Sequence, residues 1–236
     1  MTPSHAMETL PWLSNDPCLW PSPDSAFSEP NGLLAAGGDL TPERLLNAYS
    51  LGIFPWFSDG DPILWWSPSP RAVVIPEQFE ASRSLKKLLK KNLYENRINT
   101  DFEGVIRACA SIKREQTGTW ITEDMIQAYI TLHRLGWAHS FETWRGTRLV
   151  GGLYGLAIGK AFFGESMFSK ESNTSKLAFW HLCRRLSEHE FTLLDCQVAS
   201  DHLFTLGAIE MDRHVFQEHL QTALAVPSST IDWGCE

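Results

Sequence analysis

Three β-prone segments joined by very short turns constrain the fold of this chain more than any other feature. The segments 139–144, 149–158 and 161–168 are separated by turns containing residues 145–147 and 159–160. Connections this short can join strands only as antiparallel hairpins. The pattern therefore predicts an antiparallel meander, around which the rest of a sheet is built.

Helical patterns surround this meander on both sides in the sequence. The best-marked start is at Thr41, which can cap a helix that has Pro42 in its first turn and ends before Gly52. The other expected helices are 82–91, 102–112, 122–135, 173–188 and 201–206, and the other expected strands are 71–75, 191–198 and 213–216. This order predicts a mixed α+β fold with a mostly antiparallel sheet flanked by helices.

The N-terminal part of the chain differs in composition from the rest. Its first thirty residues are rich in Pro and Ser, and the aromatic segment 53–70 is broken by prolines. A chain of 236 residues has room for one compact domain and a smaller annex. We therefore expect a small N-terminal α/β domain at 1–70 and a catalytic domain at 71–236.

Charge and cysteine usage indicate the compartment and exclude several function classes. The formal net charge is -8 with an isoelectric point near 5.5, which argues against wholesale binding of polyanions. The N-terminus has no basic segment followed by an apolar one, and no apolar run reaches the roughly 20 residues of a membrane span. The five scattered cysteines fit reduced thiols, and the histidines lack metal-ligand spacing. We expect a cytoplasmic protein without a metal or a membrane anchor.

One short segment concentrates positive charge despite the acidic balance of the chain. On a helix its five bases would share one face, with leucines on the opposite face. These bases are Arg83, Lys86, Lys87, Lys90 and Lys91. A solvated surface helix is the ordinary interpretation, but a quarter of all Lys and Arg lies in this segment, which contains no carboxylate. A track for nucleic-acid phosphates is therefore favoured.

Two strand segments carry polar residues that could perform chemistry. In 193–198 the period of two places Asp195 and Gln197 on one face of the strand. Glu165 is a second carboxylate within an apolar strand segment, 162–168. A carboxylate in so apolar a run is either paired or functional, and for Asp195 a capping role is an equal alternative. Ser166 lacks the second glycine of a nucleophile elbow, so serine hydrolysis is not favoured.

Several unusual motifs together resemble the bacterial leucyl/phenylalanyl-tRNA–protein transferase family. They are Asn31–Leu40, Gly52–Phe57 with Trp65–Pro68, Gly118–Thr122, Gly164–Ser169 and Asp195–Val198. The resemblance implies a transferase that moves leucine or phenylalanine, and methionine more weakly, from aminoacyl-tRNA to proteins with N-terminal Arg or Lys. The product would be marked for degradation by the N-degron pathway. It also implies an acetyltransferase-like (GNAT) main domain, no cofactor, and a monomer.

The resemblance also assigns expected roles to individual residues. Asp195 and Gln197 would activate the attacking amine, and Glu165 would hold the acceptor's amino group or cationic side chain. The basic helix would contact the tRNA stem. Trp56 and Trp120, with Tyr129 nearby, would border the 3′ adenosine. The expected wall of the side-chain pocket consists of Leu153, Phe162, Met167 and Leu182. Leu182 stands where the resemblance leads us to expect an aromatic residue. The smaller leucine would favour the bulkier substrate, phenylalanine.

Two rival functions remain open on the sequence. An acetyl-CoA-dependent N-acetyltransferase would need a glycine-bearing pyrophosphate loop, whereas residues 170–175 contain no glycine. A non-catalytic tRNA-binding module would leave Asp195, Gln197 and Glu165 without a purpose.

Overall fold

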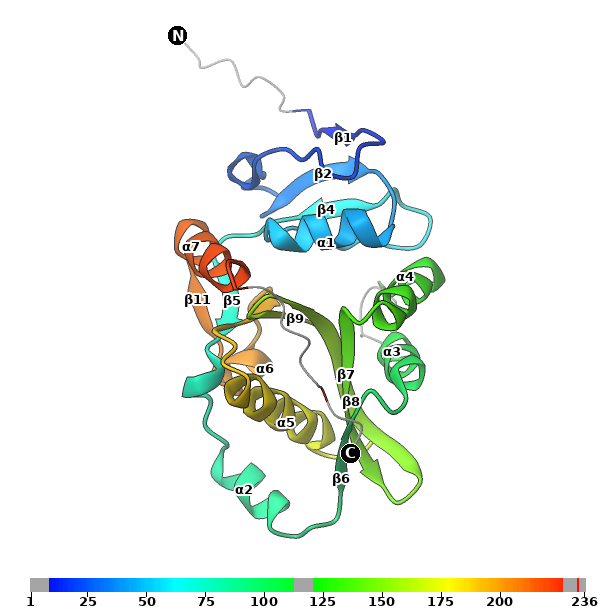
Figure 1. Ribbon diagram of the computed structural model, residues 1–236, viewed down its shortest axis with the longest axis vertical. Helices are drawn as coiled ribbons and strands as arrows, with labels where there is room; N and C mark the ends of the chain where they lie inside the picture. Colours follow the sequence, from blue (N-terminus) through cyan, green and yellow to red (C-terminus); the bar gives the residue numbers. More distant parts are fainter. Residues whose placement is uncertain (1–8, 113–120, 227–232, 234–236) are drawn as a thin grey trace.

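The structure is a computed structural model that describes residues 9–112, 121–226 and 233. The predicted meander is present as β7 (Ala138–Arg145), β8 (Arg148–Ile158) and β9 (Ala161–Ser169), which are antiparallel neighbours. They form the centre of a seven-stranded sheet of order β11-β5-β10-β9-β8-β7-β6 (Figure 1).

The outer strands complete this sheet on either side of the meander. On one side β6 (Glu95–Ile98) pairs with β7. On the other side β10 (Leu193–Gln197) pairs with β9, and β5 (Arg71–Val74) lies between β10 and β11 (Ile209–Met211). Among the described strands of this sheet, only β9 and β10 pair in parallel, so the mixed α+β fold with a mostly antiparallel sheet is confirmed.

The strand predicted at 213–216 is wrong. These residues begin helix α7 (Arg213–Leu224), and the strand that pairs with β5 comes earlier, at Ile209–Met211. Phe216, Leu220 and Ala223 are buried at helical spacing, so burial of one face of α7 decides the local structure.

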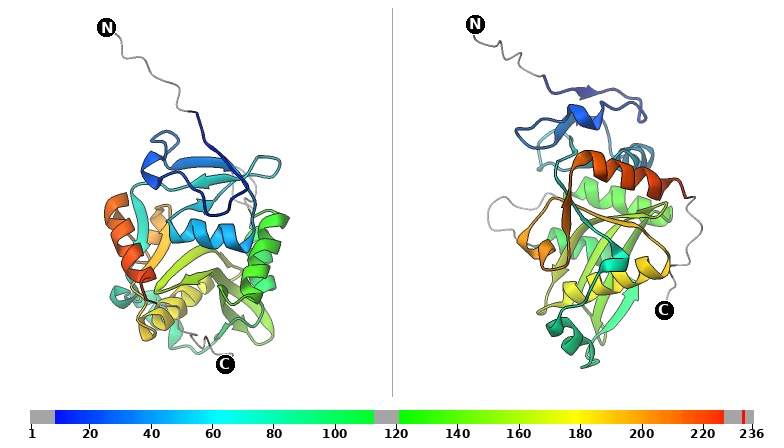
Figure 2. Two further views of the ribbon diagram at one scale, coloured as in Figure 1. Left: turned by 45° about the horizontal axis from the view of Figure 1, so that its top comes forward. Right: turned by 90° about the vertical axis from the view of Figure 1, so that its left-hand side faces the viewer.

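Helices cover both faces of the main sheet. One face carries α1 (Pro42–Ser50), α3 (Phe102–Ala110), α4 (Glu123–Arg134) and α7, whose apolar residues share one core cluster (Figures 1 and 2). The other face carries the long helix α5 (Thr174–Glu188), with α2 (Arg83–Leu89) beside it and α6 (Asp201–Phe204) contributing Leu203 to the second cluster. Two 3-10 turns lie at Pro23–Ser25 and Pro76–Gln78.

A second, four-stranded sheet lies in the N-terminal part of the chain. Its order is β1-β2-β4-β3, formed by Trp12–Leu13, Leu33–Gly37, Leu64–Trp66 and Phe54–Pro55. Helix α1 lies between this sheet and the main sheet (Figure 1). Leu34 and Trp65 of the small sheet belong to the same core cluster as Tyr154 and Phe163 of the main sheet. The two sheets are therefore held together by a shared apolar core.

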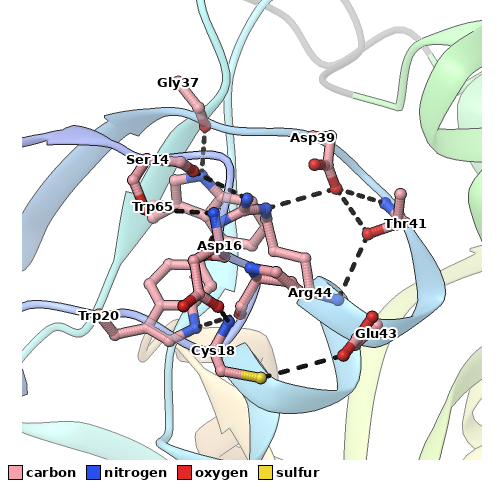
Figure 3. Close-up of polar contacts among 11 residues, drawn as sticks. Ser14, Asp16, Cys18, Trp20, Gly37, Asp39, Thr41, Glu43, Arg44 and Trp65 are labelled. Atoms are coloured by element: carbon pink, nitrogen blue, oxygen red, sulfur yellow. Dashed lines mark hydrogen bonds and ion pairs between the residues drawn. The ribbon is translucent and has the colours of Figure 1, made fainter.

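Helix α1 is fixed in place by a buried arginine. Arg44 is inaccessible to solvent, donates to the carbonyl oxygens of Asp16 and Ser14 at 3.3 and 3.0 Å, and pairs with Asp39 at 3.3 Å (Figure 3). Its guanidinium also lies over the ring of Trp20. These contacts tie the N-terminal segment to α1, whose last turn carries a residue of the site described next.

Candidate active site

A pocket opens where two central strands stop pairing. The parallel ladder of β9 and β10 ends at Phe163 and Asp195. Beyond that point the two chain segments line a pocket of about 440 Å³, with Gly164–Met167 on one side and Cys196–Ser200 on the other. The remaining wall comes from α5, α6 and β8, from Leu194 of β10, and from the end of β3 in the N-terminal sheet.

Most of the wall is apolar, which suits an apolar side chain of a substrate. Leu153, Met167 and Leu182, three of the four residues expected there, line the pocket. The fourth, Phe162, is not among the lining residues and is fully buried in the cluster beneath α5. Phe179 contributes to the wall instead.

The aromatic residues expected around an adenosine differ in position. Trp56 lines the pocket, is 44% exposed, and has its ring 5.6 Å from that of Trp66. Tyr129 is fully buried in the core and is not among the lining residues. Trp120 lies outside the described residues.

Glu165 is the carboxylate that lines this pocket, and three side chains contact it. Tyr49 donates to its Oε1 at 2.7 Å, Tyr129 contacts its Oε2 at 3.0 Å, and the amide of Gln197 donates to Oε1 at 3.3 Å. Tyr49 and Tyr129 also hydrogen-bond to each other. Tyr49 lies in the last turn of α1, Tyr129 in α4 and Gln197 at the end of β10. Three separate elements therefore converge on the carboxyl group of Glu165.

Burial sets the acidity of this carboxyl group. Loss of solvation raises the pKa of Glu165 to about 7, against the hydrogen bonds from Tyr49 and Tyr129, which lower it. The charge of Asp195 adds to the rise, and that of Arg71 opposes it. A carboxyl that titrates near neutral pH can both accept and release a proton under physiological conditions.

Asp195 is bound by a buried arginine of the neighbouring strand. Arg71 donates to both carboxylate oxygens, with distances of 2.8 and 2.7 Å, and both side chains are almost inaccessible to solvent. The guanidinium lies between the rings of Phe54 and Phe216, at 4.8 and 4.7 Å from their centroids. Asp195 is not among the residues that line the pocket.

The alternation expected along β10 is broken at its end. Leu194 and Cys196 line the pocket, as the period of two requires, but Gln197 lines it as well. A bulge in the pairing with β5 and a left-handed backbone at Gln197 (φ 58°) produce this turn. The backbone N–H of Gln197 donates to Asp195 at 2.9 Å, so Asp195 holds the bulge while Gln197 faces the pocket.

Tyr49 and Arg71 were missed by reasoning from the sequence. Tyr49 shares the buried face of α1 with Leu45 and Ala48, and this pattern indicates only core packing. For Arg71 there was a usable signal, since a lone cation that begins an apolar strand needs a partner in the core.

The predicted basic helix is present in part as α2, which ends at Leu89, before Lys90 and Lys91. The hydroxyl of Ser82 caps it by accepting the N–H of Leu85. Leu85 is buried, while all five bases of this segment, here called the basic cluster, are exposed: Arg83, Lys86, Lys87, Lys90 and Lys91. None of the ion pairs formed within the described ranges uses a base of this cluster.

No helix in the described part of the chain combines the length and the apolar character needed to span a bilayer.

Comparison with known protein families identifies the chain. Residues 73–221 match a family described as leucyl/phenylalanyl-tRNA protein transferase, and residues 38–69 match the N-terminal domain of the same enzymes. The chain belongs to this family. It is therefore an enzyme of the leucyl/phenylalanyl-tRNA–protein transferase family, and neither an acetyl-CoA-dependent acetyltransferase nor a non-catalytic binding module is favoured.

Curated relatives agree with this assignment over nearly the whole chain. A leucyl/phenylalanyl-tRNA–protein transferase of Cellvibrio japonicus is 57% identical over 89% of this chain and 90% of its own length. The corresponding enzyme of Nitrosospira multiformis is 56% identical over 90% and 91%, and that of Chromobacterium violaceum 51% over 95% and 96%. Among solved structures, L-PGS from Bacillus licheniformis aligns with a TM-score of 0.41 and 12% identity over 80% of this chain and 64% of that chain, and we draw no conclusion from it.

Proposed function

We propose that this family member transfers leucine or phenylalanine, and methionine more weakly, from aminoacyl-tRNA to the α-amine of proteins that begin with Arg or Lys. The product would carry a new N-terminal residue that serves as a degradation signal in the N-degron pathway. One observation carries the proposal: the chain matches the transferase family over most of its length. The pocket is compatible with it, because it is apolar and contains a carboxyl group, Glu165, with a pKa raised to about 7.

The wall of the pocket fits the aminoacyl end of such a tRNA. Leu153, Met167 and Leu182 would enclose the leucine or phenylalanine side chain. The unbranched Met167 can adapt to either shape. The exposed ring of Trp56 at the edge would stack on the 3′ adenosine, a contact that contributes about 1–3 kcal/mol per base.

Glu165 and Gln197 are the groups placed to act on the amine. The neutral amine attacks the ester carbonyl, the C–N bond forms, and the C–O bond to the ribose breaks. One proton leaves the nitrogen and one is gained by the ribose oxygen, so a single carboxylate can accept the first and return the second. Glu165 would carry this proton, and the Gln197 amide would hold the amine. The ester is already activated, so the reaction needs no cofactor.

Asp195 then acts as a positioning residue. Its carboxylate is occupied by Arg71 and by the backbone of Gln197, which leaves it unsuited to carrying a proton. By fixing the bulge it would aim the Gln197 side chain at the pocket. We therefore assign proton transfer to Glu165 and positioning to Asp195.

The basic cluster, on α2 and the two residues that follow it, would contact phosphates of the tRNA. Contacts between Lys or Arg and phosphate carry no sequence information, so such a surface suits an enzyme that accepts several tRNA species. Aminoacyl-tRNA and nascent or cleaved proteins meet in the cytoplasm, where we place the enzyme, and we expect it to act as a monomer.

We also propose that residues 1–70 form a small N-terminal domain and residues 71–236 a GNAT-like catalytic domain. The two separate sheets support the first statement. The antiparallel meander followed by one parallel pair, β9 and β10, which diverge at the pocket, supports the second.

The test is to incubate the protein with leucyl-tRNA and a peptide that begins with Arg, and to look for the mass of one added leucine. The same peptide with an acetylated N-terminus, uncharged tRNA, and acetyl-CoA in place of the tRNA serve as controls. We expect addition only with the free amine and leucyl-tRNA, and a loss of orders of magnitude in the Glu165→Gln variant. Absence of the product in the wild type overturns the function, and full activity of the variant overturns the role of Glu165.

A further inference from the structure

Glu165, Tyr49 and Tyr129 form three mutual contacts at hydrogen-bonding distance, but the two phenols together carry only two hydroxyl hydrogens. Tyr49 contacts Glu165 Oε1, Tyr129 contacts Oε2, and the two phenols contact each other. Three contacts among three groups need three hydrogens, whereas each phenol carries one. The Gln197 amide donates to Oε1 from outside and bridges none of these contacts. A protonated carboxyl group on Glu165 would supply the third hydrogen.

A protonated Glu165 satisfies all three contacts as a closed ring. Its Oε2–H donates to Tyr129, Tyr129 donates to Tyr49, and Tyr49 donates to Oε1. With an ionised carboxylate, both phenols donate to it and their oxygens face each other without a hydrogen. Both phenols are inaccessible to solvent, so water does not relieve that contact.

We propose that Tyr49 and Tyr129 are positioning residues that close a hydrogen-bonded ring on the protonated carboxyl of Glu165, and that this ring holds the proton in transit from the attacking amine to the ribose oxygen. The proposal rests on the proposed function for the origin and destination of the proton. The ring itself belongs to the free enzyme and can be tested there.

The phenols themselves stay protonated. Burial, together with the negative charge of Glu165, raises the pKa of both Tyr49 and Tyr129 well above its ordinary value. The other charged or titratable groups that face Glu165 or share its pocket are Arg71, Asp195, Tyr154, Cys196 and His202. None of these five provides one of the three contacts of the ring, so the ring depends on the two phenols.

A closed ring and two independent phenol donors predict opposite changes in the pKa of Glu165 when one phenol is removed. Counted as independent donors to an ionised carboxylate, as above, Tyr49 and Tyr129 lower the pKa of Glu165, so removing either phenol would raise it. A phenol that belongs to the closed ring favours the protonated form, so its removal lowers the pKa. The loss of about one net hydrogen bond corresponds to about one pH unit.

The experiment is a titration of the Glu165 carboxyl by carbon-13 NMR in the unliganded protein, with the signal assigned through Glu165→Gln. We expect the wild-type midpoint to lie well above the ordinary range of a glutamate, because burial raises the pKa of Glu165, and to fall by about one unit in Tyr49→Phe. Tyr129→Phe provides a second, independent variant with the same expectation. The acidic limb of the kcat/KM profile for transfer should move with the midpoint.

Tyr94→Phe is the matched control, because Tyr94 donates to Glu171 at 2.9 Å and this phenol–carboxylate pair lies outside the pocket. It should leave the Glu165 midpoint unchanged. An unchanged or higher midpoint in both Tyr49→Phe and Tyr129→Phe overturns the ring. Absence of transfer by the wild type at every pH overturns the proposed function alone, since the titration still reports on the ring.

Discussion

Replacing Asp195 with Asn removes a buried charge without changing the volume of the side chain. Asp195 and Arg71 are 0% and 1% exposed and share two hydrogen bonds of 2.8 and 2.7 Å. An amide NH₂ opposite the guanidinium cannot accept, so one hydrogen bond is lost and Arg71 keeps a buried charge without a counter-charge. Removing one partner of a buried ion pair costs about 3–5 kcal/mol. We expect the free energy of unfolding to fall by about this amount.

Urea unfolding followed by tryptophan fluorescence measures this loss directly. Transfer should also fall, because Asp195 accepts the N–H of Gln197 and holds the bulge that aims Gln197 at the pocket. Transfer at the wild-type rate in Asp195→Asn would refute the positioning role, and an unchanged free energy of unfolding would refute the stabilising effect of the buried ion pair.

A double variant separates the lost pair from lost packing. Combining Arg71→Met with Asp195→Leu removes both charges and should recover most of the stability that either single variant loses. The exposed pair of Arg184 and Glu188 is the control, since its side chains are 61% and 40% exposed. Glu188→Gln should change the unfolding free energy by about 0.5 kcal/mol at most. A loss in the double variant as large as the sum of the single losses would contradict the pairing argument.

Three further predictions concern the tRNA, the substrate pocket and pH. Reversal of the four lysines of the basic cluster to Glu should raise KM for leucyl-tRNA and flatten its salt dependence, which intact phosphate contacts set at a slope of roughly -3 to -4; steady-state kinetics at several salt concentrations check this. Leu182→Phe narrows a buried wall of the pocket and should lower kcat/KM for phenylalanine relative to leucine by about tenfold or more, measured with both charged tRNAs. Because the pKa of Glu165 is raised from 4.5 to about 7 on folding, the wild type should lose stability relative to Glu165→Gln as pH rises between these values and no further above them, measured by urea midpoints across that range.

The elements that could be predicted from the sequence are those with strong local signals. The meander followed from short turns, and helix starts such as Pro42 and Glu123 followed from capping residues at Thr41 and Thr122. Strand β6 was missed because its sequence, Glu95–Ile98, is charged and lies at the sheet edge, where pairing with β7 rather than local preference makes it a strand.

The site was predictable only where local pattern and three-dimensional contact coincide. Leu153 and Met167 lie in strands whose side chains alternate between the two faces of the sheet, so the face of each residue follows from the sequence. Gln197 reaches the pocket because of a bulge, which the sequence pattern does not reveal.

Charge balance in the core holds information that alternation does not. Arg71 and Asp195 each lie in a short apolar strand, and neither charge is tolerable there alone. Two opposite charges, each without a partner in its own strand, are best accommodated as a pair in adjacent strands, and β5 and β10 are adjacent. The same logic applies to the phenols of Tyr49 and Tyr129 on buried helix faces, which need polar partners, and Glu165 is the group that both reach. Matching unpaired polar groups across predicted core elements would therefore have indicated that the carboxylate bound by an arginine and the carboxylate bound by two phenols are in different environments.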